Sequence, residues 1–282
     1  MAFDEQPLTF DCAGDTLVGI LARPEGGTTP RGVLVIVGGP QCRTGSHRQF
    51  TQLARDLAQR GIPTLRFDYR GMGDSAGERR DFEQVDQDIR MAVNLFFEQV
   101  PGLEEVVLWG LCDAASAALF YACQDPRVTG LVLANPWVRT VEGQARAQIK
   151  HYYRARLTDA AMWRKVLSGQ FDFRASAGGI LSALHRAFMP GRQEQRQEDR
   201  PLPERMRDVF AKFGGRTLLI SSGEDLTARE FEDVVKASDA WRALLESPRV
   251  TRRALQEADH TFSRKAWKDQ VADWTGEWLR AW

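Results

Sequence analysis

The most informative part of the chain is the stretch Val106-Val-Leu-Trp-Gly110-Leu-Cys112-Asp-Ala114-Ala-Ser116. An unbroken apolar run, typical of a strand that is covered on both faces, passes directly into an alanine-rich helical pattern. A strand, a tight turn and a helix form the setting of a nucleophile elbow, whose central residue projects from a strained turn between two small neighbours. Gly110 and Ala114 are those small residues. Cys112 is therefore a candidate nucleophile, at a helix start that favours negative charge on sulfur.

Outward from this stretch, short β-branched and apolar runs alternate with helical patterns, which indicates βα units on a mostly parallel sheet. We expect an α/β fold with an eight-stranded sheet and helices on both faces. The predicted strands are residues 8–12, 16–22, 33–37, 64–67, 106–109, 128–133, 217–220 and 250–255, and the first two form a hairpin. Apolar residues three and four apart predict helices over residues 46–60, 82–100, 227–245 and 262–282.

One segment interrupts this alternation. Residues 137–210 show helical patches but no strand signal, and they are too long for an ordinary connection. The sequence predicts a hydrolase-like core from residues 1–136 and 211–282, with residues 137–210 inserted as a helical cap, or lid. Fourteen Lys or Arg and eight Asp or Glu give this segment a net charge of +6 in a chain that is neutral as a whole.

The composition excludes several protein classes. The chain has 282 residues, with 38 basic and 38 acidic side chains, so its charge gives no support to a nucleic-acid binder. No apolar run is long enough to span a membrane, and the acidic first residues do not resemble a secretory signal, so we expect a cytoplasmic protein. None of the four cysteines forms a C-x-x-C pair, and we expect neither a metal nor a cofactor.

A cysteine nucleophile needs a base, and the base needs a carboxylate to orient it. His260 follows the last predicted strand, where it can face the end of the strand that carries Cys112. Asp225 follows the seventh strand and is the preferred acid, with Glu224 as the alternative. The order nucleophile, acid, base is that of the α/β-hydrolases.

A tetrahedral intermediate also needs two N–H donors. The first candidate is the backbone N–H of Asp113, directly after the nucleophile. The second lies in the glycine-rich loop after the third strand, where Pro40 has no N–H and either Gly39 or Gln41 must donate.

Another segment matches a nucleophile motif literally. The residues Gly73-Asp-Ser75-Ala-Gly77 fit G-x-S-x-G. Five residues separate this motif from the end of the preceding predicted strand, so Ser75 is expected on a loop and not at a strand-to-helix turn. We therefore favour Cys112 over Ser75.

These segments resemble a known family. The whole chain is similar to the α/β-hydrolase superfamily, and it resembles the exosortase A system-associated hydrolase 1 group in Gly38–Gln41, Gly45–Phe50, Phe67–Ser75, Gly110–Ser116 and Asp259–Phe262. The resemblance implies a Cys–His–Asp triad in a bacterial cytoplasmic hydrolase. It departs from the common superfamily pattern in having Cys at 112 and Ala at 114.

The residues support three functional hypotheses. The first is a cysteine-dependent esterase or thioesterase, in which Tyr152, Tyr153 and Trp163 of the insertion line the acyl pocket and the basic insertion attracts a substrate linked to coenzyme A or to a carrier protein. The second is an acyltransferase with the same triad. The third is a hydrolase-fold protein that binds a ligand without turnover.

Overall fold

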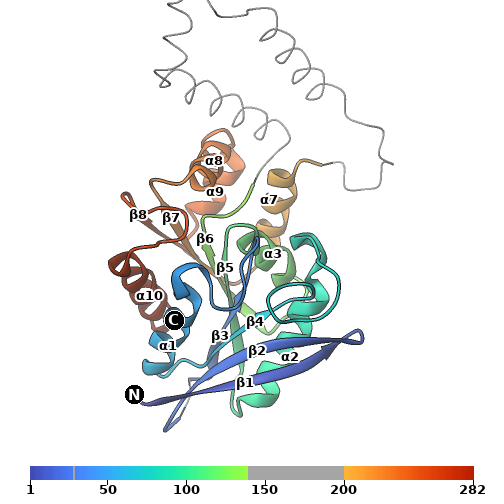
Figure 1. Cartoon of the computed structure of the whole chain (residues 1–282). Coiled ribbons are helices and arrows are strands. Elements are labelled where there is room, and N and C mark those ends of the chain that lie inside the picture. The colour runs from blue at the N-terminus through green and yellow to red at the C-terminus, as the bar shows by residue number, and fades with distance from the viewer. Residues whose placement is uncertain (28, 139–199) are drawn as a thin grey trace, which may run out of the picture. The chain divides into compact units, whose positions relative to one another are not determined.

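A computed structural model of the chain describes residues 1–27, 29–138 and 200–282. The chain divides into two compact units, one made of Met1–Val138 with Pro203–Trp282 and the other of Arg139–Leu202. The first unit contains the whole sheet (Figure 1). The predicted cap, residues 137–210, lies mostly outside the described residues and stays a prediction.

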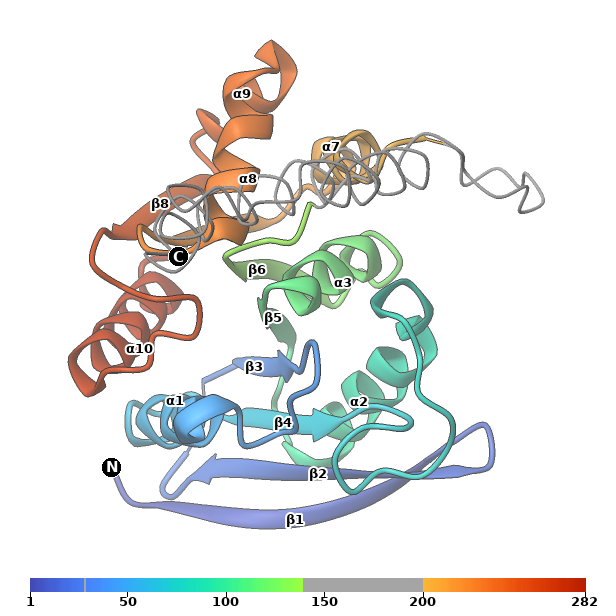
Figure 2. The ribbon, with the colours of Figure 1, turned by 45° about the horizontal axis from the view of Figure 1, so that its top comes forward.

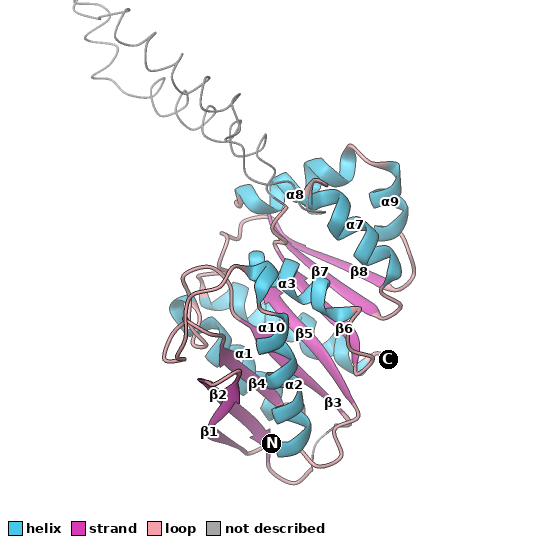
Figure 3. Cartoon of the chain, turned by 90° about the vertical axis from the view of Figure 1, so that its right-hand side faces the viewer, coloured by secondary structure: helices cyan, strands magenta, loops and turns pink. Residues whose placement is uncertain are grey.

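The first unit is built on an eight-stranded sheet (Figures 1 and 3). Its strands are β1 (Phe3–Cys12), β2 (Asp15–Pro24), β3 (Arg31–Ile36), β4 (Thr64–Asp68), β5 (Glu105–Leu111), β6 (Val128–Ala134), β7 (Arg216–Ser222) and β8 (Val250–Leu255). They lie in the order β1-β2-β4-β3-β5-β6-β7-β8. The hairpin β1–β2 and the pair β2–β4 are antiparallel, and all other pairs are parallel. The predicted fold class is confirmed.

Helices cover both faces of this sheet. In the described residues they are α1 (Gln49–Gln59), α2 (Asp86–Gln99), α3 (Asp113–Ala122), α7 (Leu202–Lys212), α8 (Leu226–Lys236), α9 (Asp239–Leu245) and α10 (Lys265–Arg280), with short 3₁₀ turns η1 (Ser46–Arg48) and η2 (Phe82–Gln84). Figure 2 shows α1 and α10 together on one side of the sheet and α2 and α3 on the other.

The structure corrects two of the predicted helices. The helix predicted over residues 227–245 is two helices, because Ser238 adopts an extended backbone and caps α9 through the Trp241 N–H. The helix predicted from residue 262 begins at Lys265, because Phe262 has a φ of 50° and Arg264 is extended. Periodicity detects buried faces but not such breaks, since the apolar spacing continues across them.

The helices predicted over 46–60 and 82–100 also begin later than expected. His47 and Arg48 both have positive φ, so the regular helix starts at Gln49 after the turn η1. Val85 separates the turn η2 from α2, so this regular helix starts at Asp86. Both helices end within a residue of the predicted position.

The central strand β5 is buried along almost its whole length. Its residues Val107, Trp109 and Leu111 belong to one apolar cluster with side chains from α1 and α10. Trp109 meets Phe50 of α1 edge to face, with ring centroids 5.6 Å apart. The strand that carries Cys112 is therefore fixed by the core directly before the turn.

Close packing at Gly110 gives a test of this arrangement. A Cβ at Gly110 would lie 2.4 Å from the Ala114 carbonyl oxygen, in the backbone of α3, so the turn would have to shift. We predict that Gly110→Ala lowers the free energy of unfolding by about 1–3 kcal/mol in urea denaturation. Gly214→Ala is the control, because its Cβ would meet nothing within 4 Å. Equal losses in both variants would contradict this packing.

Candidate active site at the carboxyl ends of the strands

Cys112 occupies a sharp turn between β5 and α3. Its φ of 64° and ψ of −125° are unfavourable for a residue with a side chain, at a cost of about 1–3 kcal/mol. Hydrogen bonds hold the turn: the Cys112 N–H donates to the Ala134 carbonyl (2.9 Å), and the Cys112 carbonyl accepts from the N–H groups of Ala115 (3.1 Å) and Trp137 (3.2 Å). The side chain is partly buried. The backbone thus has the geometry of an elbow at the predicted position.

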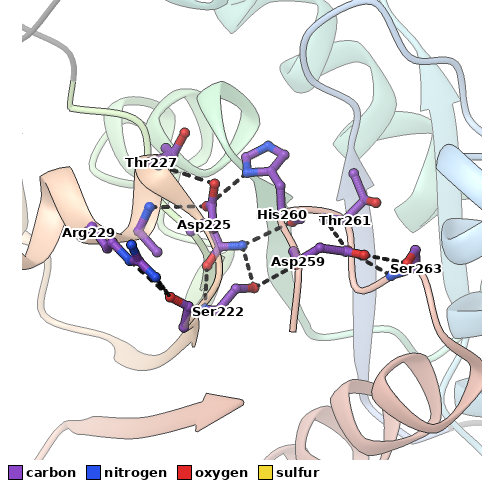
Figure 4. Close-up of polar contacts among 11 residues, drawn as sticks. Ser222, Asp225, Thr227, Arg229, Asp259, His260, Thr261 and Ser263 are labelled. Atoms are coloured by element: carbon purple, nitrogen blue, oxygen red, sulfur yellow. Dashed lines mark hydrogen bonds and ion pairs between the residues drawn. The ribbon is translucent and has the colours of Figure 1, made fainter. Parts of the chain in front are cut away.

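His260 contacts Asp225 and lies close to Cys112. Its Nδ1 is 2.9 Å from Asp225 Oδ2 (Figure 4). The hydrogen bond to Asp225 first, and the interaction with the Cys112 side chain second, raise the pKa of His260 to about 10 against the opposing effect of burial. The structure therefore brings together the three side chains that the sequence suggested from the ends of β5, β7 and β8.

Asp225 is fixed by the start of helix α8. Its carboxylate accepts from the N–H groups of Thr227 (3.2 Å) and Ala228 (3.1 Å) as the N-cap of that helix. The same Oδ2 that faces His260 accepts from Ala228. The reserve candidate Glu224 instead pairs with Arg229 on the surface, at 3.4 Å.

Two residues that the sequence did not suggest hold the loop of His260. Asn135, fully buried after β6, donates from Nδ2 to Ser222 Oγ (2.9 Å) and to the His260 carbonyl (3.0 Å). Ser222 N donates to Asn135 Oδ1 (2.8 Å), and Ser222 Oγ donates to the Asp259 carbonyl (2.9 Å; Figure 4). The sequence feature that could have pointed to Asn135 is its position directly before Pro136, at the end of a strand.

One predicted oxyanion donor, the Gly39 N–H, is occupied by a side chain. The Asp113 carboxylate accepts from the Gly39 N–H (2.9 Å) and from the Ala114 N–H (3.0 Å). Burial raises the pKa of Asp113, although hydrogen bonds from backbone N–H groups oppose the rise. The Gln41 N–H forms a long bond, 3.4 Å, to the Gly38 carbonyl. An oxyanion at Gly39 would thus have to replace the Asp113 carboxylate.

The Ser75 hydroxyl has a structural role. Its hydroxyl donates to the Asp68 carbonyl (2.6 Å) and accepts from the Val18 N–H (2.9 Å), which ties the loop after β4 to β2. It lies on a loop and not at a strand-to-helix turn. Both hydrogen-bonding roles of the hydroxyl are therefore used in the fold.

Some predicted features lie outside the described residues, among them Tyr152, Tyr153 and Trp163. In the described part of the chain, no group of three or more His, Cys, Asp or Glu side chains could hold a metal ion. Within the same residues, no helix combines the length and the apolar character needed to cross a membrane.

The sequence matches the family described as serine aminopeptidase, S33, over residues 28–199, more than half of the chain. The chain belongs to this family. Together with the sheet order and the elbow, the match makes it an α/β-hydrolase. The description names a serine enzyme, whereas this α/β-hydrolase has Cys112 at the elbow.

Solved structures share the fold at low sequence identity. An esterase of Pyrococcus furiosus is 14% identical with a TM-score of 0.68, covering 99% of this chain and 92% of that one. The α/β hydrolase GrgF of Penicillium is 18% identical with a TM-score of 0.62, covering 98% and 97%. By sequence, the curated polyketide transferase GrgF of Penicillium is 31% identical over 100 residues, so this α/β-hydrolase matches about a third, 34%, of that relative's length.

The raised pKa of His260 predicts a pH-dependent stability. The folded state holds the His260 proton more tightly than the unfolded chain, where the pKa is near 6.5. This contribution is complete below about pH 6.5 and is lost as the pH rises towards about 10. We predict that the difference in unfolding free energy between wild type and His260→Gln shrinks over that range in urea titrations.

Asp225→Asn is the matched variant, because the amide oxygen can still cap α8 while the charge is removed. NMR titration of the His260 ring should give a lower pKa in Asp225→Asn than in the wild type. An unchanged pKa would show that Asp225 is not its main cause.

Proposed function

We propose that this α/β-hydrolase cleaves activated ester or thioester substrates through a covalent acyl-enzyme on Cys112. The observation that carries the proposal is the position of the His260 ring, which is hydrogen-bonded to Asp225 through Nδ1 and lies close enough to Cys112 for that side chain to raise its pKa. A base held between a nucleophile and an orienting acid is the arrangement that acyl transfer requires. The esterase fold neighbours and the family membership support the same reaction class.

The reaction has two steps. The proton of Cys112 resides on His260 in the ion pair from which the sulfur attacks the substrate carbonyl carbon, and the tetrahedral intermediate expels an alcohol or thiol that takes this proton from His260. Water then attacks the thioester, giving its proton to His260, and the acid leaves as the ion pair of Cys112 and His260 re-forms. Asp225 orients His260 and stabilises its protonated ring.

The oxyanion of each intermediate is assigned to the N–H groups of Asp113 and Gly39. The Gly39 N–H binds the Asp113 carboxylate in the free protein. Substrate binding must therefore turn the Asp113 side chain away from Gly39.

Variant kinetics test the assignment. With a p-nitrophenyl ester, we predict that Cys112→Ala lowers kcat by about 10³-fold or more, because the side chain that carries the acyl group is removed. Ser75→Ala should retain kcat within a few-fold, since the Ser75 hydroxyl supports the fold alone. The opposite pattern, with activity retained in Cys112→Ala and lost in Ser75→Ala, would overturn the assignment.

Acyl transfer is the second candidate function. The thioester intermediate is activated towards amines and alcohols as well as water, and the relative GrgF is named a polyketide transferase. If the protein is a transferase, adding an amine or alcohol acceptor should divert the acyl group into a new product at the expense of free acid. Product ratios that do not change with acceptor concentration would favour hydrolysis.

Two further possibilities, ligand binding without turnover and a carrier-linked substrate, can each be recognised by experiment. A protein that only binds its ligand would leave Cys112 unacylated by every ester tried. Linkage of the substrate to coenzyme A or a carrier protein would appear as a higher kcat/KM for an acyl-coenzyme A than for the matching p-nitrophenyl ester. The resemblance to the exosortase-associated group suggests no substrate.

A further inference from the structure

A polar hollow adjoins the elbow. It has a volume of about 350 Å³ and is lined by Gly39, Tyr69, Arg79, Arg80, Asp81, Phe82 and Asp113. Asp113 follows Cys112 directly, and Gly39 is one of the two candidates for the second oxyanion donor, with Gln41. The hollow therefore opens next to the point where a substrate carbonyl would bind.

Its two arginines differ from others nearby. Arg43 pairs with Asp68 and with Asp74, and Arg70 pairs with the buried Asp88, with Nη2 2.8 Å from Oδ2. Among the residues that the structure describes, Arg79 and Arg80 form no ion pair or hydrogen bond through their side chains. The Nε of Arg80 is buried without a partner, as is that of Arg43, but Arg80 lacks the ion pairs that neutralise Arg43. Two cationic side chains without an acid partner at one hollow are available to an anion.

The acids of the hollow do not pair with these arginines. Asp113 accepts from the backbone N–H groups of Gly39 and Ala114, and Asp81 Oδ1 accepts from the Glu83 N–H at 3.1 Å. The Tyr69 hydroxyl, in contrast, makes no hydrogen bond to any described residue, and burial raises the pKa of Tyr69 to about 12, so it remains a donor at neutral pH. The hollow thus has donors without a described partner, on Tyr69, Arg79 and Arg80. The carboxylates of Asp81 and Asp113 already accept hydrogen bonds from the backbone.

The backbone that carries the arginines is fixed. A Cβ on Gly71 would lie 2.2 Å from the Arg79 nitrogen, so the two ends of the loop pack backbone against backbone. The Gly71 N–H also donates to the Ala76 carbonyl (3.0 Å), and Ser75 ties the loop to β2. The backbone of this loop is therefore defined, and it places Arg79 and Arg80 in the lining of the hollow.

We propose that this hollow is a subsite for an oxyanion group of the substrate, a carboxylate or a phosphate, bound by Arg79 and Arg80. A guanidinium matches either group with two parallel hydrogen bonds. The inference deepens the proposed function by giving its substrate class: acyl compounds that carry an acidic group in addition to the scissile bond. As a substrate subsite, it rests on that function.

Matched esters test the subsite. The p-nitrophenyl monoester of adipic acid and p-nitrophenyl hexanoate have acyl chains of equal length and differ in the terminal carboxylate. We expect wild type to prefer the adipate ester, and Arg79→Gln and Arg80→Gln to lower its kcat/KM by about 10- to 100-fold, the effect of losing a hydrogen bond to a charged group. The hexanoate ester should be hydrolysed at the wild-type rate.

The control is Arg253→Gln, an exposed arginine on the edge strand β8, which should change neither value. Thermal unfolding of each variant checks the fold. Equal losses for both esters, or no preference in wild type, would overturn the subsite while leaving the hydrolase function intact.

Binding without turnover separates the two proposals. Calorimetric titration with adipate and with inorganic phosphate distinguishes a carboxylate subsite from a phosphate subsite, and either binding should be lost in Arg80→Gln. If no ester is hydrolysed but one anion binds in an Arg80-dependent manner, the function fails and the anion site stands. If neither anion binds to the wild type, the anion site is wrong.

Discussion

The strained backbone at Cys112 is the constraint on which the rest of the site depends. A non-glycine residue with a φ of 64° persists only where its surroundings determine it. Here the apolar cluster fixes β5 before the turn, the first turn of α3 follows it, and the Ala134 carbonyl holds its N–H. The strain directs the sulfur out of the sheet, towards the ends of the neighbouring parallel strands, where ligands of such sheets bind.

The second constraint is the position of the His260 loop. β8 is an exposed edge strand, and packing alone does not place the loop that follows it. The buried amide of Asn135 supplies the missing positioning, because it connects the ends of β6 and β7 to the His260 carbonyl. The three strand ends are therefore connected by hydrogen bonds as well as by the sheet.

The sequence predicted the central parallel strands because buried parallel strands are unbroken apolar runs, and it predicted the helix faces because their apolar spacing is regular. The missed helix breaks at Ser238 and Phe262 depend on single backbone angles, which periodicity does not record. Cys112, Asp225 and His260 were suggested by their places after strand ends. Asn135 and the bond from Gly39 to the Asp113 carboxylate were not suggested, since each joins segments far apart in the chain.

The central claim is that the Cys112 sulfur forms a covalent bond with the acyl group. Rapid acid quenching during turnover of an activated ester, with peptide mass mapping of the quenched protein, tests it most directly. We predict the mass of the acyl group on the peptide that contains Cys112, removed by hydroxylamine as a thioester should be. Turnover with the acyl mass on another residue, or with none on Cys112 at any quench time and pH, would contradict the claim.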